Sequence, residues 1–463
     1  MNEKTKKIII LFGDLVFLYL ALFATVYARY SNLSPEHTNF GTAQYFFLHV
    51  RAFTPLIFLW LLVFYIHNLY EITSAKNNLE FYNALGRSLV FSFLTAVLFF
   101  YFADFEDVAP KTNLFIYFVV FTAFFILWRG QINRLLKRNF LTSTAIIAEN
   151  ENGYKLAIRL NQNPQIGYRV GWFIGPKPSQ ETKSVFSPEI IDSSAKKIKL
   201  SDFIREHKLK AVIIDDKALR KESVVTSLYD FVDNVEMYGL DKFNERVWRK
   251  VNLASINQLW FVNNFASGRK NLYEGLKRIL DFLVSLFFLP LGLFLGIFIA
   301  LLVKLEDGGP VFYYQKRVGQ KGRLFVLPKF RTMCVDAESK GAQLTAKNDK
   351  RVTRIGRFLR KTRLDEIPQL RNILTGEMSF VGPRAERPEF HDLLIKEIPF
   401  YDRRYLVKPG LTGWAQINYY GFNLDDTREK LAYDFYYLKN RSLVFDIGII
   451  LKTINIVLSG LGH

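Results

Sequence analysis

Four apolar segments near the N-terminus constrain the fold more than any other feature of the chain. They lie near Ile8–Tyr27, Ala52–Ile66, Leu85–Phe102 and Leu114–Trp128. Each approaches the about 20 residues that an α-helix needs to cross a bilayer. Buried helices of a soluble protein are the alternative, but such helices rarely stay apolar on every face four times in succession. The pattern therefore predicts a membrane protein with four N-terminal transmembrane helices in residues 1–138.

Lysines and arginines at the two ends of this region predict its orientation. Three lysines precede the first segment, and the stretch after the fourth carries Arg129, Arg134, Lys137 and Arg138. The loop between the third and fourth segments, DFEDVAPK, is mostly acidic. Because cytoplasmic loops are enriched in lysine and arginine, an even number of spans places both basic ends in the cytoplasm.

Composition narrows the choice of partners. Half of the 463 residues are hydrophobic and the formal net charge is +19, which excludes a disordered chain. The basic residues lie beside apolar segments and not on a recognisable nucleic-acid-binding module. We therefore expect membrane lipid and phosphate-bearing substrates as partners, and no nucleic acid. The single cysteine, Cys334, excludes an intrachain disulfide, and the six histidines match no zinc-site spacing.

Residues 139–265 differ from their neighbours, because short apolar runs alternate with helical patterns. The predicted strands are TAIIAE, YRVGWFI, KAVIID and NVEMYGL, and the helices between them include NGYKLAIRLNQ and ESVVTSLYDFV. Such alternation predicts a Rossmann-like parallel α/β domain. The turn after the first strand, AENENG, holds only Gly153, and Glu149 and Glu151 would repel a pyrophosphate. We therefore expect a regulatory or assembly domain without a nucleotide.

A longer apolar segment opens the last part of the chain, residues 266–463. No charged residue occurs from Phe282 to Val303, and a straight helix of that length would span a bilayer. However, Pro290 near its middle would kink or break the helix. Basic residues flank the segment on both sides, which favours the same side of the membrane for both ends. We therefore predict a re-entrant helix at about 279–303 that turns at Pro290 and carries a mostly helical catalytic domain.

Two adjacent carboxylates follow a basic run in RKTRLDEIPQL. If Asp365 caps a helix, Pro368 is tolerated in the first turn and the helix ends at Gly376. The helix N-terminus and the nearby cations favour the ionised form of Asp365. An ionised aspartate can act as a nucleophile toward phosphorus, and Glu366 beside it can hold Mg²⁺. Simple helix capping is the alternative explanation of the same pair.

Cations precede this pair in two stretches. Lys329 and Arg331, in KFRTM, project to one side if the stretch is extended. In KRVTRIGRFLRKTR, arginines recur every three residues as far as Arg360, which predicts a basic helix face. These residues are candidates for binding substrate phosphates, because a carboxylate attacks a phosphate only where cations or metal cancel the repulsion. Binding of anionic lipid by the basic helix is the alternative.

Four motifs together resemble the bacterial sugar transferase family, over roughly residues 270–463. The motifs are KFRTM, LRKTRLDEIPQLRNILTGEMSFVGPR, KPGLTGWAQIN and YDFYYLKNRSLVFDIGIILKT. These proteins are monotopic polyprenyl-phosphate phosphoglycosyltransferases, and the large members carry four spans and a Rossmann-like domain. The sequence departs from the family at Arg363, where a small residue is usual, and at Ala385, where proline is usual. The resemblance implies a re-entrant helix broken at a proline that matches Pro290.

The resemblance also implies a role for each candidate residue. Asp365 matches the nucleophile and Glu366 its metal-binding partner, with Mg²⁺ as the metal. The cations implied near the substrate phosphates are Lys329, Arg360 and Arg384. Trp414, in KPGLTGWAQIN, is expected either at the membrane edge or stacked on sugar or uridine.

The function implied by the resemblance is transfer of a sugar 1-phosphate from a UDP-sugar to a polyprenyl phosphate, such as undecaprenyl phosphate. UMP is released and a phosphosugar–Asp365 intermediate forms. This would be the first membrane step of bacterial exopolysaccharide, capsule or O-antigen synthesis, on the cytoplasmic face of the inner membrane, and a homodimer is plausible. The alternatives are a glycosyltransferase that releases UDP, a non-catalytic membrane scaffold or sensor, and a transporter.

Overall fold

The structure is a computed structural model, and the fold forms two compact units, Met1–Phe243 and Asn244–His463. Each unit is described by itself. The structure describes residues 3–31, 42–103, 110–178, 184–192, 199–220, 222–231, 233–265, 271–337, 349–419, 421 and 423–458. Residues 104–109 belong to the acidic loop DFEDVAPK, which was used to predict the orientation, and they lie outside these ranges. The predicted domain boundary between residues 265 and 266 falls at the edge of a described range, because residue 266 lies outside it.

Four long helices begin the first unit. They are α1 (Glu3–Tyr30), α2 (Thr42–Ile66), α3 (Leu79–Phe102) and α4 (Pro110–Arg138). The four predicted apolar segments all fall within them, and α1 packs against both α2 and α4. Together with α10 of the second unit (Asn271–Asp307), five described helices are long and apolar enough to cross a bilayer. Length and composition thus indicate a membrane protein.

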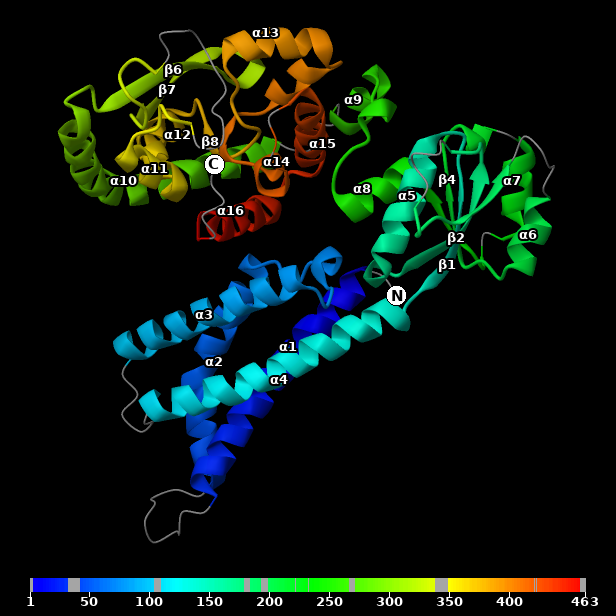
Figure 1. Ribbon diagram of the computed structural model, residues 1–463, viewed down its shortest axis with the longest axis horizontal. Helices are drawn as coiled ribbons and strands as arrows, with labels where there is room; N and C mark the ends of the chain where they lie inside the picture. The colour runs from blue at the N-terminus through cyan, green and yellow to red at the C-terminus, as the bar shows by residue number, and fades with distance from the viewer. Residues whose placement is uncertain are drawn as a thin grey trace. The chain divides into compact units, whose positions relative to one another are not determined.

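A five-stranded parallel sheet follows in the same unit. Its strands are β1 (Thr142–Ile147), β2 (Tyr168–Gly175), β3 (Glu189–Asp192), β4 (Ala211–Ile214) and β5 (Glu236–Gly239), in the order β3-β2-β1-β4-β5. Figure 1 shows α5 (Glu151–Gln162) on one face and α6 (Leu200–Glu206) and α7 (Glu222–Tyr229) on the other. The predicted parallel sheet with alternating strands and helices is confirmed, and β3 is a strand that the sequence patterns missed.

The turn between β1 and α5 differs from a glycine-rich phosphate-binding turn. Asn150 caps α5, and its side chain accepts hydrogen bonds from the amides of Asn152 and Gly153 at 3.0 and 3.4 Å. Its Nδ2 also donates to Asp215 Oδ2 at 3.0 Å. The helix N-terminus that would hold a pyrophosphate is therefore occupied by a side chain of the chain itself and is bordered by carboxylates.

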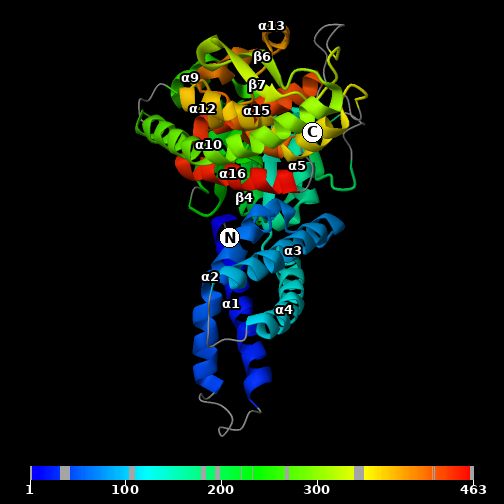
Figure 2. The same cartoon turned by 90° about the vertical axis from the view of Figure 1, so that its left-hand side faces the viewer.

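The second unit combines helices with two small sheets. After α9 (Gln258–Phe265) and α10, strands β6 (Phe312–Val318) and β7 (Leu324–Phe330) form an antiparallel hairpin, and β8 (Ser379–Val381) pairs in parallel with β9 (Gly410–Thr412). The remaining helices are α11 (Arg354–Thr362), α12 (Leu370–Thr375), α13 (Pro388–Glu397), α14 (Trp414–Asn418), α15 (Leu424–Asn440) and α16 (Leu443–Leu458). Figure 2 shows α16 beside α10, and Lys277 Nζ joins them by an ion pair of 2.5 Å to Asp446.

Helix α10 differs from the prediction that the chain turns at Pro290. The helix continues through Pro290, from Asn271 to Asp307, as one element. Its outward side is strongly apolar, with side chains such as Phe287 and Ile297 at least 70% exposed. The opposite side of α10 contacts the second unit near both ends of the helix and at its middle.

Candidate active site

The predicted carboxylate pair lies in a short 3₁₀-helix, η9 (Leu364–Gln369), that leads directly into α12. We predicted that Asp365 caps this helix, which is wrong, because the cap is Arg363 and Asp365 lies inside the first turn. The predicted end at Gly376 is confirmed, since Gly376 adopts φ 85° as the C-cap of α12. Arg363 itself adopts φ 60°, a left-handed conformation that costs a non-glycine residue about 1 kcal/mol.

Three cations surround Glu366. Lys329 Nζ lies 3.0 Å, Arg363 Nη1 3.4 Å and Arg384 Nη1 4.0 Å from the same oxygen, Glu366 Oε1. Burial works to raise the pKa of Glu366, but the charges of Lys329, Arg384 and Arg363 outweigh it and lower the pKa to about 2. Glu366 is therefore a carboxylate at neutral pH.

Asp365 meets a different environment. Its side chain is buried, and its Oδ1 has no hydrogen-bond partner within the described residues. Burial raises the pKa of Asp365; the charge of Lys329 opposes this effect, whereas ionised Glu366 adds to it. This contradicts the expectation that the surroundings favour ionised Asp365. The physical reason is that the cations contact the neighbouring carboxylate, while Asp365 loses water without gaining a hydrogen bond.

Lys329 is held in place by the β6–β7 hairpin. It lies opposite Tyr313 in the antiparallel ladder, one residue before the end of β7, and β7 packs against η9. Burial lowers the pKa of the Lys329 ammonium, and the charge of Glu366 partly offsets that effect. The ion pair thus joins strand and helix, and it leaves an ammonium beside the two carboxylates.

The other two predicted cations occupy different places. Arg331 is buried and pairs with Asp307 at the end of α10, so the structure does not bring it to Glu366. Arg360, on α11, donates from Nε to Thr332 Oγ1 at 2.8 Å. Gly356 permits this close approach of α11, because a Cβ there would lie 2.1 Å from the carbonyl oxygen of Thr332.

The donor atoms at this site fit an Mg²⁺ ion that takes most of its ligands from water and substrate. Within the described residues, no cluster of three or more His, Cys, Asp or Glu side chains occurs. Magnesium, however, is commonly bound by one or two carboxylates together with substrate phosphates and waters. Asp365 Oδ1, buried without a partner, and the carboxylate of Glu366 would supply the protein ligands.

Two residues that sequence reasoning missed support the loop carrying Arg384. Arg404 is buried, pairs with Asp434 at 2.7 Å, and donates from Nη2 to the backbone oxygen of Arg384 at 3.2 Å. Arg317 Nη1 donates to the next carbonyl, that of Ala385, at 3.0 Å. Both arginines lie far from the Asp-Glu pair in sequence, so no local pattern indicated them.

Trp414 was predicted either at the membrane edge or stacked on sugar or uridine, and its position in the structure matches neither. Its indole is 3% exposed and lies within the hydrophobic core of the second unit. The indole Nε1 donates to the backbone oxygen of Arg249 at 2.9 Å. Trp414 therefore packs inside the domain, where a satisfied indole N–H makes burial favourable.

Comparison with known proteins adds an independent line of information. A profile described as bacterial sugar transferase matches residues 272–460. Over 230 residues, the chain is 47% identical to a UDP-N-acetylgalactosamine-undecaprenyl-phosphate N-acetylgalactosaminephosphotransferase of Aeromonas hydrophila, a match that covers 50% of this chain and 54% of that protein. The chain therefore spans about half the length of this relative.

Two further relatives differ in how much of their length is matched. A UDP-glucose:undecaprenyl-phosphate glucose-1-phosphate transferase of Escherichia coli (strain K12) is 32% identical over 319 residues, covering 67% of this chain and 66% of that protein. An uncharacterized sugar transferase of Bacillus subtilis (strain 168), EpsL, is 41% identical over 187 residues, covering 40% of this chain and 87% of that protein.

Proposed function

The chain belongs to the bacterial sugar transferase family, and from that premise we propose that it transfers a sugar 1-phosphate from a UDP-sugar to a polyprenyl phosphate, releasing UMP. The reaction would begin the membrane stage of exopolysaccharide, capsule or O-antigen synthesis. The names of two relatives, which include undecaprenyl-phosphate as acceptor, support this proposal. The donor sugar differs between those names, so the proposal specifies the class of donor and not one sugar.

One observation carries the proposal. Asp365 and Glu366 are buried side by side, and Lys329, Arg363 and Arg384 lie within 4.0 Å of Glu366. Buried carboxylates among several cations are arranged to meet a phosphate, because the cations cancel the repulsion between a carboxylate and the phosphate oxygens. Helix capping alone does not explain the pair, since Asp365 caps nothing.

In the first half-reaction, the Asp365 carboxylate attacks the β-phosphorus of the UDP-sugar. A bond forms between a carboxylate oxygen and phosphorus, and the bond from phosphorus to the bridging oxygen breaks, so that UMP leaves with that electron pair. Arg384, which is 41% exposed at its side chain, is available to bind the diphosphate as it arrives. Ionised Glu366 holds Lys329 and Arg363 close to the reacting carboxylate.

In the second half-reaction, an oxygen of the polyprenyl phosphate attacks the same phosphorus. The acyl-phosphate bond breaks and the Asp365 carboxylate is regenerated, which leaves a sugar joined to the lipid through a diphosphate. Bound Mg²⁺, held by Asp365 and Glu366, would neutralise charge on the phosphate oxygens.

We further propose that α10 enters the membrane from the cytoplasmic face and does not cross it. Near its start, Arg278 donates to the backbone oxygen of Ile373 at 2.5 Å, and near its end Glu306 accepts from the amide of Ile355 at 3.1 Å. Between these points, Gly292 lies against Ile367 and Leu370. One face of α10 thus contacts the same folded unit along roughly 42 Å, at 1.5 Å per residue. A hydrocarbon core of about 30 Å leaves no room for that unit if the helix spans it.

The nucleotide released by the purified protein tests the proposal. The protein is incubated with Mg²⁺, undecaprenyl phosphate and one of four donors: UDP-N-acetylgalactosamine, UDP-glucose, UDP-galactose or UDP-N-acetylglucosamine. UMP formed with at least one donor is the expected result. UDP would indicate transfer of the sugar alone, and absence of both nucleotides with all four donors would favour a non-catalytic scaffold.

A further inference from the structure

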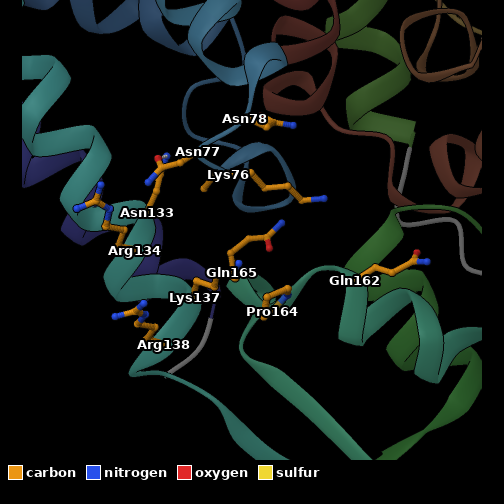
Figure 3. Close-up of a pocket in the computed structure, with 11 residues that line it drawn as sticks. Lys76, Asn77, Asn78, Asn133, Arg134, Lys137, Arg138, Gln162, Pro164 and Gln165 are labelled. Atoms are coloured by element: carbon orange, nitrogen blue, oxygen red, sulfur yellow. Dashed lines mark hydrogen bonds between the residues drawn. The ribbon is translucent and has the colours of Figure 1, made fainter. Parts of the chain in front are cut away.

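The first unit contains a pocket of about 570 Å³ where the helical bundle meets the α/β domain. Figure 3 shows α4 side chains on one side, Gln162 of α5 on the other, and Lys76 and Gln165 between them. A volume in this range is typical of sites for small molecules and cofactors. The lining residues come from three stretches of the first unit, within 75–78, 133–138 and 162–165.

The lining is rich in groups that bind anions. Lys76, Arg134, Lys137 and Arg138 are cations, most of the other lining residues carry amide side chains, and no lining residue is acidic. Among the described residues, none of the four cations has a carboxylate within ion-pair distance. Asn78, the N-cap of α3, also lines the pocket, so the positive end of a 24-residue helix borders it.

One of the residues that line the pocket is a buried amide with an unused acceptor. Asn133 is 3% exposed, and its Oδ1 has no hydrogen-bond partner within the described residues. Its Nδ2 donates to Asn77 Oδ1 at 3.1 Å, and Asn77 in turn donates to the carbonyl of Gly130 at 3.0 Å. A buried acceptor without a donor is costly, and a ligand that donates a hydrogen bond would satisfy it.

The two walls of the pocket are held together by buried and partly buried hydrogen bonds. Lys6, on α1, donates from Nζ to the backbone oxygens of Gln165 and Ile166 at 3.2 and 2.6 Å. Gln165 Nε2 donates to the backbone oxygen of Thr73 at 2.9 Å. The pocket is therefore built into the fold between the bundle and the α/β domain, and a ligand there would contact both.

The position along α4 places the pocket at the outer edge of the lipid head-group layer and beyond it. The apolar run of α4 ends near Trp128, so Asn133 lies about 8 Å and Lys137 about 14 Å beyond it, at 1.5 Å per residue. The polar layer of a bilayer is roughly 5–8 Å thick on each side. A lipid phosphate can therefore reach the end of the pocket near Asn133 from the membrane, and a soluble phosphate can reach the end near Lys137 from the cytoplasm.

We propose that this pocket binds one phosphate-bearing ligand whose head group also donates a hydrogen bond, such as the glycerol of phosphatidylglycerol or the ribose of a nucleotide. The cations bind the phosphate and the amides bind the polar remainder. Cations that merely anchor a helix end at a membrane surface would attract anionic lipid without a fixed stoichiometry. Saturable binding of one ligand per chain therefore distinguishes the two explanations.

The experiment compares the full-length protein with Lys76→Gln/Lys137→Gln. The matched control, Lys4→Gln/Lys177→Gln, removes two lysines that do not line the pocket. Binding of dioctanoyl phosphatidylglycerol, dioctanoyl phosphatidylcholine, UMP and inorganic phosphate is measured by calorimetry at about 0.15 M salt, and native mass spectrometry gives the stoichiometry. Because the exchanged lysines are at least partly exposed, both variants should fold, and thermal unfolding checks this.

We expect one saturable pocket site whose affinity falls at least tenfold in Lys76→Gln/Lys137→Gln and less than twofold in the control. Loss of phosphatidylglycerol binding would assign the pocket to a lipid, and loss of UMP or phosphate binding to a soluble ligand. Binding at the catalytic site would persist in the pocket variant and so remain separate. Equal binding by all three proteins, equal losses in both variants, or pocket-dependent binding of phosphatidylcholine as tight as that of phosphatidylglycerol would overturn the proposal.

Discussion

Asp365 and Glu366 are adjacent in sequence, yet their carboxyl groups meet opposite surroundings. Glu366 receives three cations within 4.0 Å, whereas Asp365 Oδ1 is buried without a partner. Opposite pKa shifts in a neighbouring pair are typical of sites where two acidic groups have different tasks. This difference supports the proposal that Asp365 is the nucleophile and that Glu366 organises the cations.

Replacement of the proposed nucleophile is the first test at this scale. Asp365→Asn keeps the shape of the side chain and removes the attacking carboxylate, so we expect UMP release to fall by at least about a thousandfold. Thermal unfolding should not shift downward, because burial disfavours the charge that is removed. Asp402→Asn, a change of an exposed carboxylate in the same domain, is the control and should leave UMP release unchanged. Turnover near wild type in Asp365→Asn would remove the residue from the mechanism.

The pH dependence of UMP release follows from the same pair. The proposed attack requires ionised Asp365. Because the pKa of Asp365 is raised above 3.8, activity should fall with decreasing pH through an apparent pKa above 3.8. The lowered pKa of Glu366 contributes its full stabilisation of the fold above about pH 4.5, and this contribution is lost progressively as the pH falls from about 4.5 to about 2. Loss of activity above about pH 4.5 would therefore not result from unfolding caused by protonation of Glu366.

The variant Glu366→Gln tests whether the charge of Glu366 raises the pKa of Asp365. Removing the negative charge beside Asp365 should lower the pKa of Asp365 and move the acid limb of the rate profile to lower pH. Single-turnover rates between about pH 4 and 8, with circular dichroism at each pH, would measure this. An acid limb that stays in place or moves upward would show that Glu366 does not act on Asp365 in this way.

At this scale, the sequence predicted that Lys329 lies beside the Asp365-Glu366 pair, but not where Arg331 lies or how each carboxyl group ionises. The motif positions of Lys329, Asp365 and Glu366 led to the pair and its cation. The preference of the cations for Glu366, and the pairing of Arg331 with Asp307, depend on tertiary packing that no local pattern records.

Helix α10 is the element whose relation to the membrane matters most. Its outward face is apolar along its length, while Lys277 and Val303, near its two ends, are buried against the same domain. The sequence predicted its apolar character and its basic flanks. It did not predict a helix continuous through Pro290, because packing against a domain can support a proline that would break an isolated helix.

Cysteine accessibility tests whether α10 crosses the membrane. In a Cys334→Ser background, single cysteines are placed at Leu272 and Leu305, which are exposed before and after the apolar stretch. If both ends lie in the cytoplasm, a membrane-impermeant maleimide should label both in inside-out vesicles and neither in intact spheroplasts. Val185→Cys, an exposed position in the α/β domain, reports labelling from the cytoplasm. Labelling of Leu305→Cys alone in spheroplasts would show that the helix spans.

At the scale of the whole molecule, the two units contribute different kinds of site. The second unit holds the carboxylate pair, and the first holds the cationic pocket between its bundle and its α/β domain. Hydrophobic runs predicted the helices and the parallel sheet, since these patterns are local. The pocket escaped prediction, because it joins residues near positions 76, 133 and 165 that are close only in the folded chain.

The covalent intermediate tests the central claim most directly. The wild-type protein is incubated with Mg²⁺ and the donor that supports nucleotide release, without acceptor lipid, and its intact mass is measured. We predict a mass increase of one sugar phosphate per chain, an equal amount of UMP, and a modified peptide that carries the group on Asp365. Release of UDP, a modification on another residue, or complete transfer to lipid with no modified protein at any time would contradict the proposal.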